Sequence, residues 1–396
     1  MKTILVDLID TQDVYKGSGI YIRKVFLSLL RYVDENRIGF DVHFICTYDS
    51  RKKILYPDFE VKKLESNPRI TLVDISKTTF VEICDRYSVN TVFLGFGQQI
   101  YYYNFIGVKS KVICVLHDIF DLEYEDTKLD AYIKLNKSFF KRCKSFIGEF
   151  LRILYRIIKK GRKHHSYKSH IDFFKENTNY TIVTVSSYSY HSLLHYLPFP
   201  KEKILVLWSP EKELPELKPI ENVSLKKLID SGARYILLVS ANRELKNPVK
   251  TIKVFLNYKM NNPQEDLLLL TIGFGKSLSN DHIDLPYLND VDIEYAYKFC
   301  YALIYPSFFE GFGYPPLEVM KYGKPVLSSN VCSMPEILGN SPIWFSPFYS
   351  TDIYKALFTL MNSDYDQLCK RAFEQYLVVS KRQKEDLDSL VKLILS

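Results

Sequence analysis

Short apolar runs alternate with amphipathic segments along this chain, and the same rhythm occurs twice. The alternation predicts an α/β fold, in which helices cover both faces of parallel sheets. In the first half the expected strands are residues 3–8, 42–46, 70–73, 91–94, 112–116 and 181–185, and residues 20–33 are expected to form a helix with one buried face. In the second half the expected strands are residues 235–240, 267–272, 302–305, 325–328 and 342–345.

A stretch rich in Pro, Glu and Lys, residues 208–219, separates the two halves and has the composition of a linker. The length of 396 residues fits two domains of ~100–200 residues each. We therefore expect one domain at residues 1–208, a second at 209–380, and a terminal segment at 381–396 with a helix over 385–395. Because ligands of open α/β sheets bind beyond the carboxyl ends of the strands, we expect a ligand cleft where the two sheets face each other.

Composition and charge exclude several classes of protein. The net charge of +7 is moderate and no nucleic-acid-binding module is visible, so no nucleic acid partner is expected. Asp7 and Asp10 interrupt the apolar N-terminus, and no stretch has the roughly 18 uncharged apolar residues of a transmembrane helix. The 7 cysteines include no C-x-x-C pair, which predicts reduced thiols and a cytoplasmic location.

Residues 306–326 carry the strongest functional signal. A loop containing Glu310 follows an apolar run, and two prolines stand where a helix would begin, a position that tolerates their missing N–H. A strand, a glycine loop and a helix in succession predict an anion site, because backbone N–H groups and the positive helix end face the same ligand. Glu310 and Glu318 add carboxylates for hydroxyl groups, so the combination suits a phosphorylated sugar.

Glu310 and Glu318 have seven residues between them. Glu310 begins the sequence Glu-Gly-Phe-Gly-x-Pro, and Gly-x-Pro-Val and Ser-Met-Pro-Glu (residues 333–336) follow Glu318. This pattern resembles the donor-site motif of retaining glycosyltransferases of family 4, the group 1 type. The resemblance implies the GT-B fold, with two Rossmann-like domains whose parallel sheets face a central cleft and a last helix that returns to the first domain. It also implies that Glu318 holds ribose hydroxyls, that Glu310 holds sugar hydroxyls, and that the diphosphate meets the amides of Gly311, Phe312, Gly313 and Tyr314.

Two cations follow the expected strand 235–240. Arg243 and Lys246 could clamp a diphosphate and stabilise the charge that develops as the donor bond breaks. Lys246 matches the phosphate lysine of the family. Arg243 fits less closely, since Ser240 stands where the family has a glycine and Leu245 stands beside the lysine. Ordinary surface charge is the alternative for both cations.

In the first half, Gly17, Ser18 and Gly19 form a glycine-rich turn before the expected helix, where the family also has a glycine-rich loop. Glycines there allow close approach of a diphosphate or an acceptor, although a plain strand–helix turn has the same composition. His117 follows the strand 112–116, at the edge of the sheet where ligands bind. In the family a histidine at this place lies near the transferred sugar, and a capping or core histidine is the alternative.

Two further loops could pass the nucleotide. Gly273, Phe274 and Gly275 follow the strand 267–272, and Asn289 precedes the next expected helix. In the family the second of these segments passes the base mostly through backbone contacts. A plain connecting loop is an equally good interpretation, and neither interpretation identifies the base.

Residues 136–168 form a basic, amphipathic insert. Apolar residues recur every three or four positions and cations occupy most other positions. Such a helix can lie in a bilayer surface while its cations attract anionic lipid. A helix packed on the first domain with a solvated basic face explains the pattern equally well.

Together these features predict a retaining glycosyltransferase that moves a sugar from a nucleoside diphosphate donor to a hydroxyl of a glycan. We expect the glycan to be lipid-linked and the reaction to serve the synthesis of a cell-surface polysaccharide. The resemblance implies no cofactor and no metal. The membrane partner would be the inner face of the plasma membrane, contacted through 136–168. Two alternatives remain: a non-catalytic sugar-nucleotide-binding subunit of a synthase, and a GT-B epimerase or phosphorylase. The donor base, the sugar, the acceptor, the linkage and the oligomeric state are not encoded in any motif.

Overall fold

The computed structural model describes residues 1–13, 17–35, 40–52, 64–97, 107–120, 122–123, 179–212 and 218–396. Lys16 and the basic insert 136–168 lie outside the described residues. The chain divides into two compact units. The first consists of the described residues of Met1–Glu123 and Lys137–Lys212 together with Gln383–Ser396, and the second of those of Glu213–Arg382.

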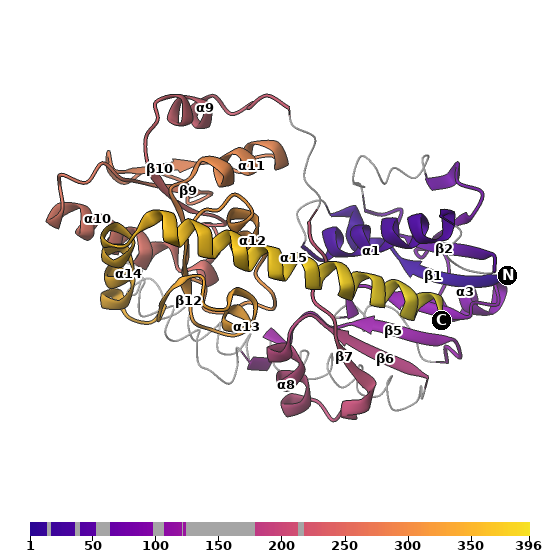
Figure 1. The fold of residues 1–396 in the computed structure, drawn as a ribbon. Coiled ribbons are helices and arrows are strands. Elements are labelled where there is room, and N and C mark those ends of the chain that lie inside the picture. Colours follow the sequence, from indigo (N-terminus) through magenta and orange to yellow (C-terminus); the bar gives the residue numbers. More distant parts are fainter. Residues whose placement is uncertain are drawn as a thin grey trace, which may run out of the picture. The chain divides into compact units, whose positions relative to one another are not determined.

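A parallel sheet forms the centre of the first unit (Figure 1). Its order in the described part of the chain is β3-β2-β1-β4-β5-β6-β7. The strands are β1 (Lys2–Asp7), β2 (Val42–Tyr48), β3 (Ile70–Asp74), β4 (Thr91–Leu94), β5 (Lys111–Val115), β6 (Tyr180–Thr184) and β7 (Ile204–Val206). The central strands are apolar and buried along almost their whole length, as expected for a parallel sheet that is covered on both faces.

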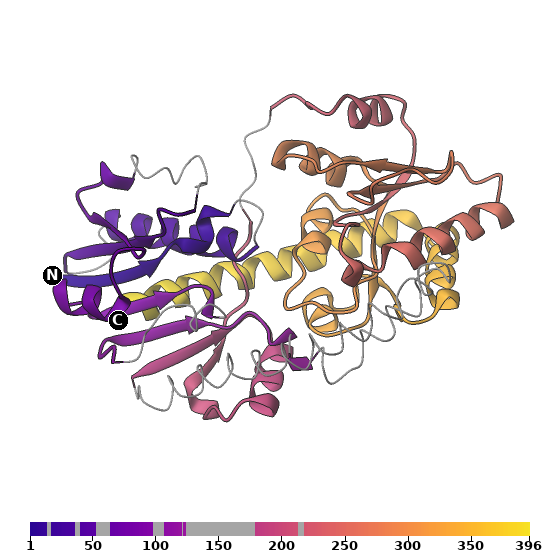
Figure 2. The same ribbon diagram turned by 180° about the vertical axis from the view of Figure 1, so that it is seen from behind.

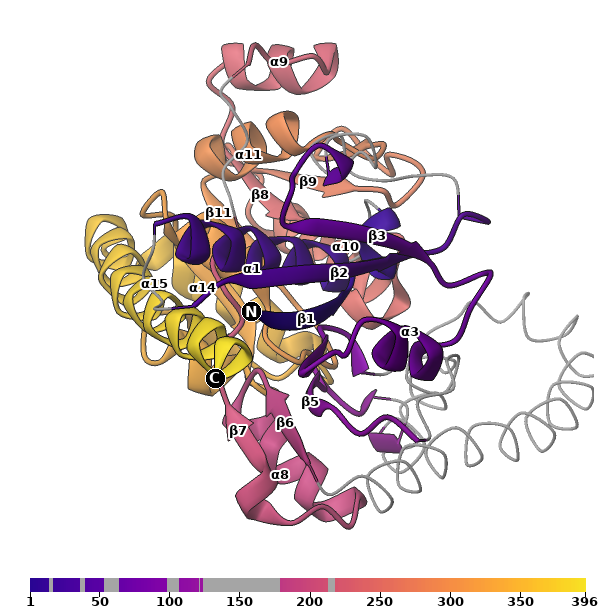
Figure 3. The same cartoon turned by 90° about the vertical axis from the view of Figure 1, so that its right-hand side faces the viewer.

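Helices cover both faces of this first sheet. They are α1 (Gly17–Asp34), α3 (Phe80–Arg86) and α8 (Ser187–Tyr196), with the 3₁₀ segments η1 (Ile9–Gln12) and η4 (Lys201–Lys203). Phe26 of α1 meets Phe44 of β2 edge to face, with ring centroids 5.6 Å apart. The next residue, Ile45, shares a core with Phe80 of α3. Successive residues of a strand point to opposite faces, so α1 and α3 lie on opposite sides of the sheet (Figure 3).

The second unit contains another parallel sheet, in the order β10-β9-β8-β11-β12-β13 (Figure 2). Its strands are β8 (Tyr235–Leu238), β9 (Leu268–Ile272), β10 (His282–Leu285), β11 (Ala302–Tyr305), β12 (Val326–Ser329) and β13 (Ile343–Phe345). Because β8 and β11 pair directly and in parallel, the loops that follow these two strands leave the sheet side by side.

The helices of the second unit are α9 (Val223–Asp230), α10 (Pro248–Asn261), α11 (Asp290–Phe299), α12 (Tyr314–Met320), α13 (Met334–Leu338), α14 (Ser350–Asn362) and the first part of α15 (Tyr365–Leu395), with the 3₁₀ turn η5 (Glu244–Lys246). Phe255 of α10 and Leu357 of α14 share one core with Ile236 and Ile304 of the sheet. On α11, the backbone oxygen of Ala296 accepts a hydrogen bond of 3.0 Å from the hydroxyl of Tyr235.

The end of α15 is anchored within the first unit by several polar contacts. Asp386 Oδ2 accepts a hydrogen bond of 2.8 Å from the backbone N–H of Trp208. Gln383 Nε2 donates to the backbone oxygen of Ser209 over 2.7 Å. At the last turn, Lys2 Nζ and Lys111 Nζ each donate to a backbone oxygen of the helix over 3.0 Å, which satisfies carbonyls that a helix end leaves unpaired.

The elements differ from the sequence-based expectations at a few places. The helix expected over 20–33 begins at Gly17, so the glycine-rich turn is its first turn. The helix expected over 385–395 is the end of the 31-residue α15. Strands β7 and β10 were not predicted. No helix among the described residues is long and apolar enough to cross a membrane.

The Asp386 anchor gives a stability prediction. Asp386→Ala leaves the N–H of Trp208 without its side-chain acceptor, and losing a partner of a partly buried group costs about 1–3 kcal/mol. Asp388→Ala is the matched control, because Asp388 makes an exposed ion pair with Lys392 worth about 0.5 kcal/mol or less. Urea unfolding followed by circular dichroism measures both changes. Equal losses in the two variants would contradict the assigned role of Asp386.

Candidate functional site

The loop between β11 and α12 is held in one shape by its own residues. Gly313 caps α12 in the left-handed region (φ +89°). A Cβ atom there would also collide with the side chain of Met334, so only glycine fits. Ser333 Oγ donates to the backbone oxygen of Glu310 over 3.0 Å. A hydrogen bond from the start of the neighbouring helix α13 therefore holds the loop that contains Gly311 and Phe312. This loop leads into Tyr314, the first residue of α12.

Lys246, Tyr305 and Glu310 form a contact cluster at the carboxyl ends of β8 and β11. Lys246 Nζ donates to the hydroxyl of Tyr305 over 2.6 Å and to Glu310 Oε1 through a short hydrogen bond. The ammonium lies 4.3 Å from the centroid of the Tyr305 ring, at its hydroxyl end. The backbone N–H of Phe308 donates to the oxygen of Leu245 over 2.9 Å and ties the two loops together.

The cluster is almost removed from water. The side chains of Lys246 and Glu310 are 7% and 13% exposed, respectively. Burial lowers the pKa of Lys246, and the negative charge of Glu310 opposes that shift. Burial and the nearby Glu310 carboxylate raise the pKa of Tyr305, so the phenol stays neutral. A protonated lysine, a neutral phenol and a carboxylate therefore share one small volume.

Arg243 lies beside this cluster on an exposed turn. Its positive charge further lowers the pKa of Lys246, which places the guanidinium within electrostatic range of the ammonium. The turn is built on two non-glycine residues in the left-handed region, Ser240 (φ 54°) and Asn247 (φ 50°). Asn247 Nδ2 donates to the backbone oxygen of Pro347 over 3.0 Å, which fixes the end of the turn.

Glu318 lies on α12 and is partly buried. A hydrogen bond with Glu318, together with burial, raises the pKa of Tyr297 on α11. On the same pair of helices, Glu294 accepts short hydrogen bonds from Lys321 and Tyr322. The contacts join α11 to α12 and fix the direction in which the Glu318 carboxylate leaves its helix.

The loop of Gly273, Phe274 and Gly275 already uses two of its amides. The N–H groups of Phe274 and Gly275 donate to Asp284 over 2.9 and 2.7 Å. Asn289 is the N-cap of α11: its Oδ1 accepts from the N–H of Asp292 over 2.7 Å, and its Nδ2 donates to Glu221 over 2.9 Å. The structure thus gives the Asn289 side chain a capping role.

His282 extends the network below this loop. Its Nδ1 accepts from the backbone N–H of Leu278 over 3.1 Å, so the proton of the neutral ring is on Nε2. Nε2 lies 2.9 Å from Thr271 Oγ1, which in turn donates to Asp284 over 2.6 Å. Burial lowers the pKa of His282, because a charged ring would lose its solvation, and the negative charge of Asp284 opposes that shift.

In the first unit, Ser18 and Gly19 lie in the first turn of α1 against the buried Asp10 of η1. Ser18 Oγ donates to Asp10 Oδ2 over 2.6 Å. A Cβ atom at Gly19 would lie 2.5 Å from the backbone oxygen of Asp10, so the helix approaches η1 closely only because this residue is glycine. A Cβ atom at Gly17 would meet no atom within 4 Å.

His117 follows β5 and is oriented by its surroundings. Its Nε2 lies 2.9 Å from the backbone oxygen of Gly95 and must carry the proton, because a carbonyl only accepts. The ring meets Tyr21 edge to face at 4.7 Å. Burial lowers the pKa of His117, and the negative charge of Asp10 opposes the shift. The neutral ring therefore has its lone pair on Nδ1, which can accept a hydrogen bond from a hydroxyl group.

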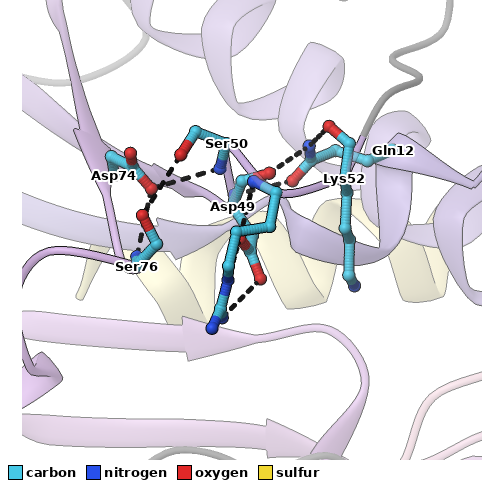
Figure 4. Close-up of polar contacts among 7 residues, drawn as sticks. Gln12, Asp49, Ser50, Lys52, Asp74 and Ser76 are labelled. Carbon is cyan, nitrogen blue, oxygen red and sulfur yellow. Dashed lines mark hydrogen bonds and ion pairs between the residues drawn. The ribbon is translucent and has the colours of Figure 1, made fainter.

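Polar contacts beyond β2 and β3 hold η1, and with it Asp10, in place (Figure 4). Gln12 donates to the backbone oxygen of Asp49 over 3.0 Å and accepts from the N–H of Asp49 over 2.8 Å. Asp74 accepts from the N–H groups of Ser50 and Ser76 over 3.1 and 3.0 Å. These hydrogen bonds lower the pKa of Asp74, so it stays ionised and keeps both loops together.

Within the second unit, the structure brings the predicted residues Lys246 and Glu310 into contact and places Arg243 near them. Within the first unit, it gathers Ser18, Gly19 and His117 around Asp10. Tyr305 and Asp10 were not predicted as site residues. The sequence presents Tyr305 as the end of an apolar run and Asp10 as a charge that interrupts the N-terminus, although an acid three residues after the first strand was a usable signal.

Comparison with known proteins agrees with this geometry. Residues 220–375 match the family model described as glycosyl transferases group 1. The serotype-specific mannosyltransferase WbdA of Escherichia coli is 38% identical over 103 residues, which are 26% of this chain and 12% of WbdA. The O-antigen chain mannosyltransferase B of Escherichia coli is 46% identical over 63 residues, which are 16% of each chain. The chain thus spans only a small part of these relatives.

The fold also occurs in solved structures. HepE from Anabaena, in complex with UDP and glucose, superposes with a TM-score of 0.66 at 12% identity, covering 100% of this chain and 99% of that one. The two parallel-sheet α/β units therefore have the GT-B fold. The second unit carries a group 1 glycosyltransferase domain, which confirms the resemblance seen in residues 306–336.

The His282 network gives a pH prediction. The pKa of His282 is lowered in the folded protein, so below the ordinary histidine value of about 6.5 the unfolded chain binds the proton first. Its contribution to stability is full above about pH 6.5 and falls at lower pH by at most about 1.4 kcal/mol per pH unit. His282→Gln should weaken this dependence in urea unfolding between pH 7.5 and 5.0. The control His191→Gln, at an exposed position, should retain it.

Proposed function

We propose that this protein is a retaining, metal-independent glycosyltransferase that moves a hexose from a nucleoside diphosphate donor to a hydroxyl of a glycan. The observation that carries the proposal is the buried Lys246–Tyr305–Glu310 cluster beside the braced loop before α12. It combines a cation for phosphate and a carboxylate for hydroxyls at adjacent strand ends of a group 1 domain.

Lys246 is suited to a diphosphate because an ammonium group has three N–H donors. Tyr305 and Glu310 accept two of them, and the third can meet a phosphate oxygen of the donor. Arg243 adds positive charge from the exposed turn, and the amides of Gly311, Phe312, Gly313 and Tyr314 add dipoles. Because Pro315 and Pro316 have no N–H, the donors of this segment lie in the loop before them.

The remaining residues take the roles that the group 1 motif implies. Glu318 holds ribose hydroxyls, and its contact with Tyr297 keeps the carboxylate oriented. Glu310 holds sugar hydroxyls. In the first unit, His117 accepts a hydrogen bond from a hydroxyl of the sugar through Nδ1. The turn of Gly17, Ser18 and Gly19 lies where the diphosphate or the acceptor approaches, and a ligand meets no obstructing atom next to Gly17. Asn289 contributes backbone contacts to the base while its side chain caps α11.

In the proposed reaction, the bond between the anomeric carbon and the donor phosphate breaks first, through an oxocarbenium-like state. The acceptor oxygen attacks from the same face, and its proton passes to the departing phosphate oxygen. The chain's part is to stabilise the negative charge on that leaving group with Lys246 and Arg243. Glu310 and Glu318 act on hydroxyls and are not the acid and nucleophile of a glycosidase.

The relatives suggest the sugar and the acceptor. WbdA and O-antigen chain mannosyltransferase B are mannosyltransferases by name, so we propose mannose as the sugar. As the acceptor we propose a growing, lipid-linked cell-surface polysaccharide. The basic insert 136–168 would then hold the protein at the cytoplasmic face of the membrane. The direct test is to incubate the protein with UDP-, GDP- and dTDP-sugars and follow nucleotide release, with proton NMR of the product to establish the anomeric configuration.

The first prediction of this proposal concerns Lys246. Lys246→Ala removes one preorganised partner of the leaving group, which costs ~3–4 kcal/mol in the barrier, or roughly 10²–10³-fold in kcat. Lys250→Ala is the control, because Lys250 lies one turn further on and donates to the backbone oxygen of Phe348. Normal turnover in the Lys246 variant would rule out the diphosphate clamp.

The second prediction concerns metal ions. The chain contains three Asp-x-Asp sequences, at residues 290–292, 364–366 and 386–388. In each of them one aspartate has a structural partner: Asp292 accepts the N–H groups of Glu221 and Asn222, Asp364 accepts that of Gln367, and Asp386 accepts that of Trp208. We expect EDTA to leave the initial rate of transfer unchanged. A loss that Mn²⁺ or Mg²⁺ restores would contradict the metal-independent mechanism.

A further inference from the structure

We infer that Tyr305 is a positioning residue that keeps Lys246 ready to bind the donor diphosphate, by accepting a hydrogen bond from the ammonium. The inference rests on the proposed function above. Tyr305 lies at the end of β11, is 2% exposed, and belongs to a strand that pairs with β8, from which the Lys246 turn leaves the sheet.

The geometry gives the hydroxyl two partners of opposite charge. Its oxygen lies 2.6 Å from Lys246 Nζ and can only accept from the ammonium. A hydrogen bond also joins Tyr305 to Glu310, and its effect is to raise the pKa of the phenol. The phenol therefore donates to the carboxylate while it accepts from the cation. Such a bridge fixes the lysine and the glutamate relative to one another, which neither strand does by itself.

A neutral partner has a particular value at this position. The charged or titratable groups that face Lys246 are Glu310 from the loop after β11, Arg243 from the turn after β8, and Tyr305 itself. Glu310 stabilises the ammonium but also neutralises it. Tyr305 stabilises it through one hydrogen bond to a neutral hydroxyl, and it leaves the full positive charge available to phosphate.

The protonation state of Lys246 decides whether the site works. Burial and Arg243 both favour the neutral amine. A neutral amine has two N–H donors rather than three, and it carries no charge to offset that of a diphosphate. Without the Tyr305 hydroxyl, Lys246 should therefore lose its proton, and with it the ability to bind the donor diphosphate, at a lower pH than in the unaltered protein.

The test compares Tyr305→Phe, which keeps the ring, with Tyr305→Leu, which removes it. Tyr235→Phe is the matched control: Tyr235 lies on β8, is 1% exposed, and donates to a backbone oxygen over 3.0 Å. With the sugar nucleotide that the unaltered protein consumes, kcat/KM is measured from pH 6 to 10. We expect Tyr305→Phe to lower kcat/KM about tenfold at pH 7 and to move the alkaline limb about one unit lower, and Tyr305→Leu to do more.

The control should lose a similar hydrogen-bond contribution to stability and keep the alkaline limb of the unaltered protein. A Tyr305→Phe variant whose alkaline limb coincides with that of the control would overturn the inference. An effect on KM or stability alone would do the same, because a purely structural role predicts that result.

A second measurement requires no sugar nucleotide. Competitive acetylation with acetic anhydride, read by peptide mass spectrometry, reports the pH at which half of Lys246 is reactive. We expect this midpoint to be lower in Tyr305→Phe than in the unaltered protein, and an unchanged midpoint would refute the inference. If no UDP-, GDP- or dTDP-sugar is consumed but the midpoint shifts, the proposed function fails while the link between Tyr305 and Lys246 stands.

Discussion

The buried ammonium of Lys246 constrains the second unit more than any other single group. Moving a charge out of water costs several kcal/mol unless a close partner replaces the solvent. Here the replacement is Glu310, with Tyr305 between them. Tyr305 ends the strand that pairs with the one preceding Lys246, and Glu310 lies in the loop that follows Tyr305. The order of the sheet, the shape of the loop before α12 and the left-handed turn at Asn247 all have to be correct for the charge to be tolerated. An arrangement that is costly to assemble and leaves one N–H for a ligand fits a site that binds phosphate.

Local patterns predicted most of the strands but missed β7 and β10. The expected bounds of β4 and β11 agree with the structure, since both are fully buried and uniformly apolar. Strands β7 and β10 lie at sheet edges in the described part of the chain, but so do β3 and β13, which were predicted, so edge position alone does not explain why two strands were missed. Leu205 of β7 is exposed, and β10 contains His282 and Asp284, which serve the hydrogen bonds of the adjacent loop. A half-covered edge strand does not need an apolar run, and β10 has none, whereas β7 begins a run of five apolar residues, 204–208, that the predictions passed over.

The site was predictable only where a motif specified it. Glu310 and Lys246 stood out by spacing and by charge, but their contact depends on the pairing of β8 with β11, which no local pattern contains. Tyr305 could not be separated from the apolar residues before it, because a buried tyrosine packs like a phenylalanine until its hydroxyl finds a partner. Asp10 became visible only through the contact with Ser18 and the close approach of Gly19. In each case the missing information was the neighbour brought in by tertiary structure.

Ser240 illustrates how such a turn constrains sequence change. It has a left-handed backbone (φ 54°) that a residue with a side chain adopts at a cost of roughly 1–2 kcal/mol. The rest of the turn, through the Lys246 contacts, supplies the free energy that holds this conformation. Selection for heat tolerance should therefore favour glycine at this position and act against a β-branched residue, which adopts the left-handed backbone least readily. Sequence drift at Ser240 is thus restricted by backbone shape alone, although its side chain takes no part in the chemistry.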